Sequence, residues 1–202
     1  GSLGSGAVVD NAALVFNRSD ALTVASTISG TGTLEQAGTG ITTLTGNNTY
    51  GGATTISAGT LGIGVSGSVG ASDGFSRYNY TGTISIASGS ALSFSSGVNQ
   101  IFSGALSGAG GLNKSGSGAL RLAADNSNYS GALTVTGGTL GLYTNSALGT
   151  GSLTIGGATL SLGRAVSQIS NSITLSGATS VNLDREVDYL IVGGGGGGGG
   201  DN

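Results

Sequence analysis

Side chains able to do chemistry are few, and their types exclude most catalytic arrangements. The 202 residues include no His and no Cys, so the chain can build neither a Ser-His-Asp triad nor a thiol nucleophile, and the usual zinc ligands are missing. Three of the nine acidic residues alternate, at Asp184, Glu186 and Asp188, which would place them on one face of a strand. They could be calcium ligands or a solubilising cap at the end of the fold. We favour the cap, and we expect no enzyme, no metal and no cofactor.

A second group combines aromatic and charged side chains. It lies in residues 65–83, which depart from the pattern of the surrounding sequence, and it consists of Asp73, Phe75, Arg77, Tyr78 and Tyr80. Tyrosine and arginine are frequent contact anchors in binding sites, and exposed rings can stack on sugars. The segment is the best candidate for a loop that projects from the rod, and these five residues are candidate ligand contacts. The alternative is that the rings fold over the side of the molecule and cover aliphatic surface.

The composition indicates a folded, all-β chain. Glycine contributes 43 residues and proline none, while 37% of the residues are hydrophobic and only 7% are charged, for a net charge of −3. This is too much apolar surface and too little charge for the usual disordered class. Glycine recurs at short intervals through much of the chain, and each one costs about 1 kcal/mol in a helix interior. The sequence has no run of Lys or Arg, which excludes a nucleic acid partner held through its phosphates.

An internal repeat organises the sequence. Residues 30–64 (the first copy) return at 108–142 (the second copy), so that GTGTLEQAGTG corresponds to GAGGLNKSGSG. A shorter signature recurs at regular spacing from Thr134, Thr154 and Thr174, as TVTGGTLGL, TIGGATLSL and TLSGATSVNL. Short periods of this kind mark solenoids. Since the shift between the copies is close to four such coils, we expect them to lie on the same side of a rod.

Alternation within the repeats predicts which side chains are buried. In one strand Leu120 and Leu122 face inward and Arg121 faces out, as a half-buried strand requires. Stacking such positions gives an aliphatic core with almost no ionisable groups. Asn47-Asn48 and Asp125-Asn126 stand at corners flanked by glycine, where side-chain amides can bond the backbone of a turn.

The first copy resembles the passenger-associated transport repeat of bacterial autotransporters. That pattern is roughly G-x-G-x-L followed by G-x-G-x-L-x-L-T-G-x-N-T-Y-x-G-x-T-x-[IV]-x-x-G-T-L. The second copy follows it with Asp125-Asn126 in place of Asn47-Asn48. The resemblance implies a right-handed parallel β-helix that is secreted or displayed at the cell surface, in a protein whose C-terminal region is anchored in the outer membrane.

We therefore expect one elongated domain and a tail. Residues 1–192 should form a right-handed parallel β-helix with coils of about 20 residues, in which 7–16 is either an N-terminal cap or an ordinary first rung. Residues 193–202 read as a glycine-rich tail or a linker to a missing C-terminal region. The preceding Tyr-Leu-Ile-Val also resembles the start of glycine-rich regions in some bacterial surface proteins, where such runs bundle as polyproline-II helices.

The function expected from these features is structural. The chain would be a rigid stalk or adhesin-like passenger segment of an exported surface protein, and it could build filaments by self-association through the ends of the helix. The alternative is a module that binds a glycan or a host receptor through the aromatic loop 73–80.

Overall fold

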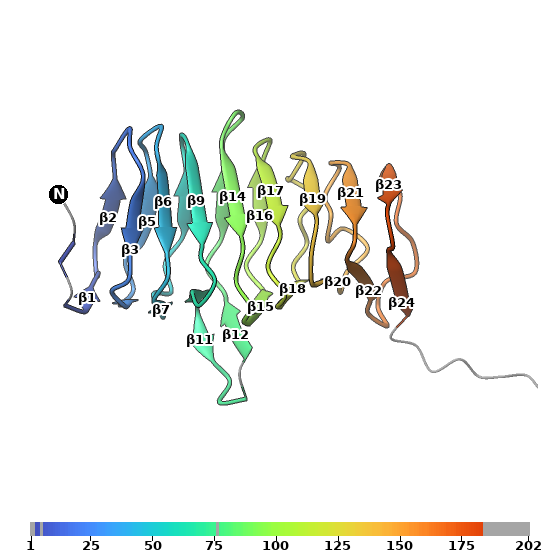
Figure 1. Ribbon diagram of the computed structural model, residues 1–202, viewed down its shortest axis with the longest axis horizontal. Coiled ribbons are helices and arrows are strands. Elements are labelled where there is room, and N and C mark those ends of the chain that lie inside the picture. The colour runs from blue at the N-terminus through green and yellow to red at the C-terminus, as the bar shows by residue number, and fades with distance from the viewer. Residues whose placement is uncertain (1–2, 5, 76, 184–202) are drawn as a thin grey trace, which may run out of the picture.

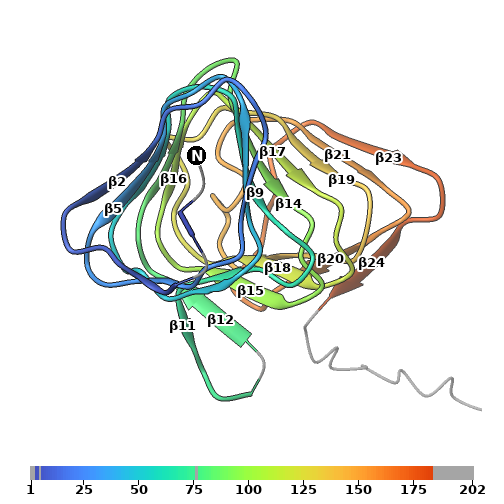
Figure 2. The same cartoon turned by 60° about the vertical axis from the view of Figure 1, so that its left-hand side comes forward.

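The computed structural model describes residues 3–4, 6–75 and 77–183, and these form a solenoid of about nine turns. Every turn runs across three faces, so strands from successive turns stack as parallel neighbours along a long axis (Figure 1). Viewed closer to that axis, the turns enclose a common interior (Figure 2). The described residues contain no helix, and therefore none that could cross a membrane. The predicted all-β parallel helix is confirmed.

Three sheets make up most of the three faces. Face 1 is five-stranded and contains β2 (Ala13–Phe16), β5 (Thr33–Gln36), β8 (Thr54–Ile56), β13 (Ile84–Ile86) and β16 (Leu106–Gly108). Face 2 is eight-stranded and contains β3 (Leu22–Val24), β6 (Ile41–Leu44), β9 (Thr60–Ile63), β14 (Ala91–Phe94), β17 (Gly111–Lys114), β19 (Leu133–Val135), β21 (Leu153–Gly156) and β23 (Ile173–Ser176).

Face 3 changes character along the axis. In the early turns it consists of two short parallel pairs, β1 (Val8–Val9) with β4 (Ile28–Ser29) and β7 (Asn47–Asn48) with β10 (Ser68–Val69). Further along it becomes a seven-stranded sheet of β11 (Ala71–Ser72), β12 (Arg77–Tyr80), β15 (Asn99–Phe102), β18 (Ala119–Leu122), β20 (Thr139–Leu142), β22 (Thr159–Leu162) and β24 (Ser180–Leu183). Among the described strands, β11 and β12 form the single antiparallel pair.

The interior is built from ladders of aliphatic side chains. Leu112, Leu133 and Leu153 occupy paired positions on successive turns of face 2, and all three are buried. Each such side chain contributes roughly 1.5–3 kcal/mol on burial. Leu120 and Leu122 point inward and Arg121 is only half-buried, which confirms the predicted alternation.

Glycine is required where the turns approach each other most closely. A Cβ on Gly52 would lie 2.1 Å from the carbonyl oxygen of Gly32, and one on Gly131 would lie 1.8 Å from that of Gly110. Neither position tolerates any side chain, because the obstacle is backbone. The glycine content therefore follows from how tightly parallel turns stack at their corners.

The two repeat copies do not lie on the same side of the rod, so that prediction is wrong. Leu34 of the first copy is in β5 on face 1, whereas its counterpart Leu112 is in β17 on face 2. The reason is an insertion: the turn from Thr54 to its partner Ile84 is longer than the turn from Leu34 to Thr54. Three turns thus carry Leu34 onto Leu106, and the chain then rounds a further corner before it reaches Leu112.

The structure describes the N-terminal segment 7–16 but not the predicted C-terminal strand and tail. Residues 7–16 form β1 and β2, and β2 pairs in register with β5 (Ala13 with Thr33), so this segment is a rung. The acidic residues Asp184, Glu186 and Asp188, the expected last strand at 187–192 and the tail at 193–202 lie outside the described residues.

Candidate functional site

The inserted residues form a hairpin that projects from face 3. Strands β11 and β12 pair antiparallel, Ser72 with Tyr78, and extend below the body of the solenoid in both views (Figures 1 and 2). The returning strand β12 continues into the solenoid by pairing parallel with β15. The predicted projecting loop is therefore present, as an arm rooted in a sheet.

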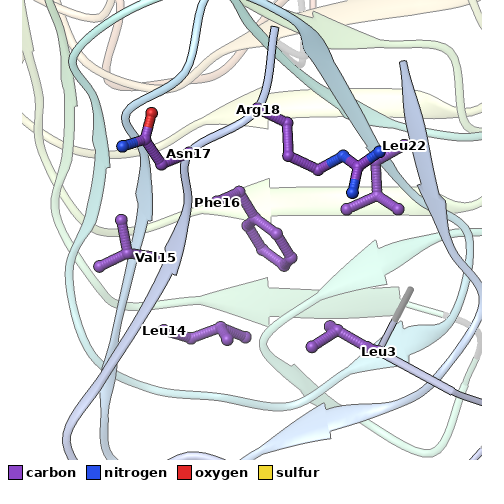
Figure 3. Close-up of a pocket in the computed structure, with 7 residues that line it drawn as sticks. All are labelled: Leu3, Leu14, Val15, Phe16, Asn17, Arg18 and Leu22. Atoms are coloured by element: carbon purple, nitrogen blue, oxygen red, sulfur yellow. The ribbon is translucent and has the colours of Figure 1, made fainter. Parts of the chain in front are cut away.

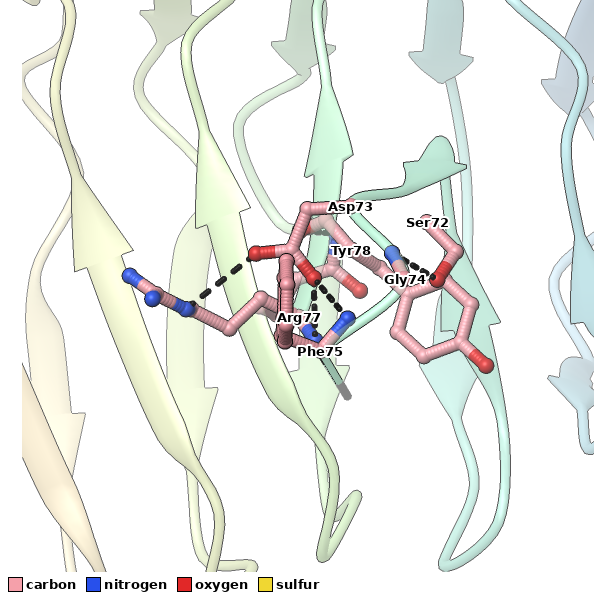
Figure 4. Close-up of polar contacts among 7 residues, drawn as sticks. Ser72, Asp73, Gly74, Phe75, Arg77 and Tyr78 are labelled. Carbon is pink, nitrogen blue, oxygen red and sulfur yellow. Dashed lines mark hydrogen bonds and ion pairs between the residues drawn. The ribbon is translucent and has the colours of Figure 1, made fainter.

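A single carboxylate holds the tip of this arm. Oδ1 of Asp73 accepts hydrogen bonds from the backbone N–H groups of Phe75 (2.8 Å) and Arg77 (3.1 Å), and its Oδ2 lies 3.2 Å from Nε of Arg77 (Figure 4). The bond from the Phe75 N–H, followed by the contacts from Arg77, lowers the pKa of Asp73. Phe75, at the tip, is 82% exposed. The tip thus displays an aromatic ring on a backbone fixed by its neighbours.

The root of the arm is anchored in the core, and Tyr80 is its anchor. Its side chain is only 1% exposed, with its ring 5.5 Å from that of Tyr50 and 6.3 Å from that of Phe102. The Tyr80 hydroxyl bonds Oγ1 of Thr54 (2.6 Å) and the carbonyl of Gly52 (2.5 Å). Burial raises its pKa. The expectation that Tyr80 contacts a ligand is wrong, because it faces the interior side of β12.

A buried amide closes the neck of the arm. Gln100 donates from Nε2 to the carbonyls of Val69 (2.5 Å) and Tyr78 (3.0 Å), and its Oε1 accepts from the N–H of Val69 (3.1 Å). These bonds join Gln100 of β15 both to β10, which precedes the hairpin, and to β12, the returning strand of the hairpin. Tyr78 itself is half-buried on the same side of the strand as Tyr80. Of the predicted contact residues, Asp73, Phe75 and Arg77 are exposed.

A shallow pocket on the outer side of face 3 begins beside the arm. It has a volume of about 260 Å³ and is lined by Arg77, Ile101, Arg121, Ala123 and Tyr143. The sequence indicated that Arg121 faces out, but it gave no signal for Tyr143. Only stacking of successive turns brings these residues together.

The rest of the described chain offers a further cavity and no cluster of metal-ligating side chains. No three of its Asp and Glu residues are close enough to hold a metal ion. A larger cavity of about 310 Å³, at the first turn, is lined mainly by aliphatic and aromatic residues around Leu14, Phe16 and Leu22 (Figure 3). Arg18 at its rim pairs with Asp20 at 2.6 Å.

Parallel rungs with a lateral arm define a β-solenoid repeat protein. Comparisons with protein-family models and with known proteins show what the chain is similar to. The model of the passenger-associated-transport-repeat family matches residues 34–63 and 112–142. The chain is also similar to the adhesin BmaC autotransporter of Brucella suis biovar 1 (strain 1330), with 40% identity over 106 residues. That match covers 46% of this chain and 3% of the relative, so the chain corresponds to a small part of that protein. No solved structure matches.

These matches confirm the resemblance seen in the sequence. The chain carries two passenger-associated transport repeats, at residues 34–63 and 112–142, and it is similar to a segment of an autotransporter adhesin, a similarity that supports export to the cell surface.

Proposed function

We propose that this chain is a non-enzymatic, adhesin-like passenger segment in which a rigid solenoid holds the β11–β12 arm out as a contact element. The observation that carries the proposal is the construction of the arm. Its tip exposes Phe75 while its root, Tyr80, is buried in the aromatic core. Exposed aromatic side chains on a preorganised backbone lose little entropy on binding. The similarity to an adhesin autotransporter supports the same role.

The proposal is tested by measuring retention of beads coated with the purified chain on cultured host cells under flow. Phe75→Ala should reduce retention several-fold, because it removes the main apolar contact of the tip. Val65→Ala is the matched control, since Val65 is also an exposed apolar residue (72%) but lies before the arm. If the Phe75 variant is retained as well as the wild-type chain, the arm is not the contact element.

End-to-end association is a second candidate function. No described strand pairs with the outer edge of β2, and the cavity in Figure 3 opens next to it. At the other end of the described solenoid, β23 and β24 leave Leu175 and Leu183 more than half exposed. Open strand edges of this kind can pair with another molecule.

Sedimentation velocity across a hundredfold range of concentration tests this association. Sedimentation coefficients that increase with concentration, together with filaments in electron micrographs, would support it. A constant coefficient would exclude it without affecting the role of the arm.

A further inference from the structure

The pocket on the outer side of face 3 combines apolar, aromatic and cationic residues. Its lining combines the apolar side chains of Ile101 and Ala123 with the cationic side chains of Arg77 and Arg121 and the aromatic side chain of Tyr143. These side chains come from β12, β15 and β18 and from the residues that directly follow β18 and β20. The site is separate from the exposed tip of the arm at Phe75.

The position of the Tyr143 ring depends on two neighbouring glycines, Gly141 and Gly163, which have no side chains. A Cβ on Gly141 would lie 3.0 Å from Cε2 of Tyr143, and a Cβ on Gly163 would lie 2.8 Å from its Cδ1. The ring therefore rests against the backbone of two successive turns, where any larger residue would displace it. Cζ of Arg121 lies 5.7 Å from the ring centroid, so the cation and the aromatic ring form one unit.

The electrostatics of the pocket favour an anion. Arg121 forms no ion pair with a carboxylate of the described residues, and Arg77 pairs only with Asp73 among them, at 3.2 Å on exposed surface. Such a pair is weak and screened by salt, so a ligand can compete for the Arg77 guanidinium. Two cations thus share one pocket in a chain with only 7% charged residues and a net charge of −3.

We infer that this pocket binds a carboxylate-bearing sugar residue of an acidic glycan. Guanidinium groups match carboxylates in bidentate geometry, and the C–H face of a pyranose ring can pack on Tyr143 and Ile101. The volume of about 260 Å³ lies just below the range of pockets for drug-sized ligands, which suits a single sugar unit. The inference goes beyond the proposed adhesive role of the arm and does not depend on it.

The test is titration of the purified, isotopically labelled chain with trigalacturonate, and separately with sialyllactose, followed by NMR. Methyl-esterified trigalacturonate and lactose are the controls without a carboxylate. Binding of either acidic sugar, with shifts at Ile101 and Ala123 and none from its control, supports the proposal and tells uronic from sialic acid. If neither acidic sugar binds below about 10 mM, or the ester binds equally well, the proposal is wrong.

Variants separate a specific site from general charge attraction. Arg121→Gln keeps most of the side chain over Tyr143 but removes the charge, and should weaken binding at least about tenfold. Arg18→Gln makes the same charge change at the far end of the described solenoid and should leave the affinity unchanged. Equal losses in the two variants would overturn the site. Arg121 faces out, so thermal melting should confirm that its variant folds.

The adhesive role of the arm can fail or succeed independently. Phe75→Ala should leave sugar binding unchanged, because Phe75 does not line the pocket. Loss of cell retention in that variant with intact sugar binding would support both conclusions. Loss of sugar binding in Phe75→Ala would show that the pocket assigned here is the wrong site.

Discussion

The two repeat copies form the same kind of side-chain hydrogen bonds, but on different faces of the solenoid. In the first copy, Oδ1 of Asn48 accepts the N–H of Ile28 (3.0 Å) and its amide donates to the carbonyls of Gly46 and Ser68 (2.8 and 3.1 Å). In the second, Asn126 accepts the N–H of Leu106 (2.8 Å) and donates to the carbonyl of Ala147 (2.7 Å). The predicted corner amides are thus confirmed, and they tie together turns on either side.

The faces differ because the copies start at different points of the turn. Asn48 lies in β7 on face 3, whereas Asn126 bonds Leu106 of β16 on face 1. Tyr50 and Tyr129, which follow the two asparagines, are both 1% exposed. The repeat therefore specifies how one turn bonds to the next, and it works equally well at two corners of the same solenoid.

One matched position shows a chemical difference between the copies. Gln36 donates from Nε2 to the carbonyls of Gly38 and Gly40 (2.7 and 3.2 Å), and its counterpart Lys114 donates from Nζ to those of Gly116 and Gly137 (2.5 and 3.1 Å). Lys114 is 1% exposed and lies 5.7 Å from the centroid of the Phe94 ring. The expectation of a core with almost no ionisable groups therefore has an exception at Lys114.

Burial has an energetic cost for each of the two side chains, Gln36 and Lys114. Oε1 of Gln36 is buried and has no hydrogen-bond partner among the described residues, whereas the ammonium of Lys114 has only donors to satisfy. Desolvation instead penalises the charge, and burial lowers the pKa of Lys114 to about 8. The comparison shows that two different side chains can supply a buried donor to the glycine carbonyls of such a corner.

The largest expected effect comes from the corner glycines. Gly52→Ala and Gly131→Ala should each destabilise the chain by more than about 4 kcal/mol, or prevent folding, because the new Cβ meets a backbone carbonyl that cannot move aside. Gly51→Ser is the control: a Cβ there meets nothing within 4 Å, and the second copy has Ser130. Urea unfolding followed by circular dichroism measures all three, and a stable Gly131 variant would contradict the stacking.

The next largest effect should come from the corner asparagines. Asn48→Leu and Asn126→Leu should each cost about 2–4 kcal/mol, since each leaves a buried N–H and buried carbonyls without partners. Similar losses at the two sites would show that the corner is equivalent on different faces. Asn47→Asp, which reproduces Asp125 of the second copy, should change stability by less than about 0.5 kcal/mol. Strongly unequal losses would break the equivalence.

Lys114 should give the chain a pH dependence that the first copy lacks. Because its folded pKa (about 8) is below its ordinary value of 10.5, the unfolded state binds more protons between these values. Stability should therefore rise from pH 7 to pH 10 by on the order of 2 kcal/mol. Lys114→Gln should remove this rise and Gln36→Lys should add a second one, as measured by urea midpoints at each pH.

The direction should reverse at higher pH. Burial raises the pKa values of Tyr50 and Tyr129 above the ordinary value of 10, so the folded state holds those protons longer and stability falls above pH 10. A flat profile between pH 7 and 10 in the wild-type chain would show that Lys114 is better solvated than its position indicates.

The smallest effect on stability should come from the tip of the arm that separates the copies. Phe75→Ala should change the free energy of unfolding by less than about 0.5 kcal/mol, because the ring is exposed. Tyr80→Ala should cost about 3–5 kcal/mol, since it empties an aromatic core position. Similar losses for the two variants, by thermal or urea unfolding, would contradict the division of the arm into an exposed tip and a buried root.

The sequence alone determined the fold class and much of the core. Alternation at Leu120, Arg121 and Leu122, the recurring short signature and the corner asparagines each predicted what the structure shows, because stacking of parallel turns repeats one local environment. The projecting segment was also predicted, since its aromatic and charged residues break the pattern. The separation of Tyr80 from Phe75 was not, because both are aromatic residues in one short stretch.

Only the tertiary structure decided how the turns are phased. The number of residues between the two copies does not reveal how many of them belong to the arm. Residues in the arm do not contribute to a turn of the solenoid, so their number changes the corner at which the next repeat begins. For the same reason the pocket of Arg77, Arg121 and Tyr143 was invisible in the sequence. Side chains a full turn or more apart along the chain become neighbours only once the register between turns is fixed by backbone hydrogen bonds and by the buried ladders that those bonds align.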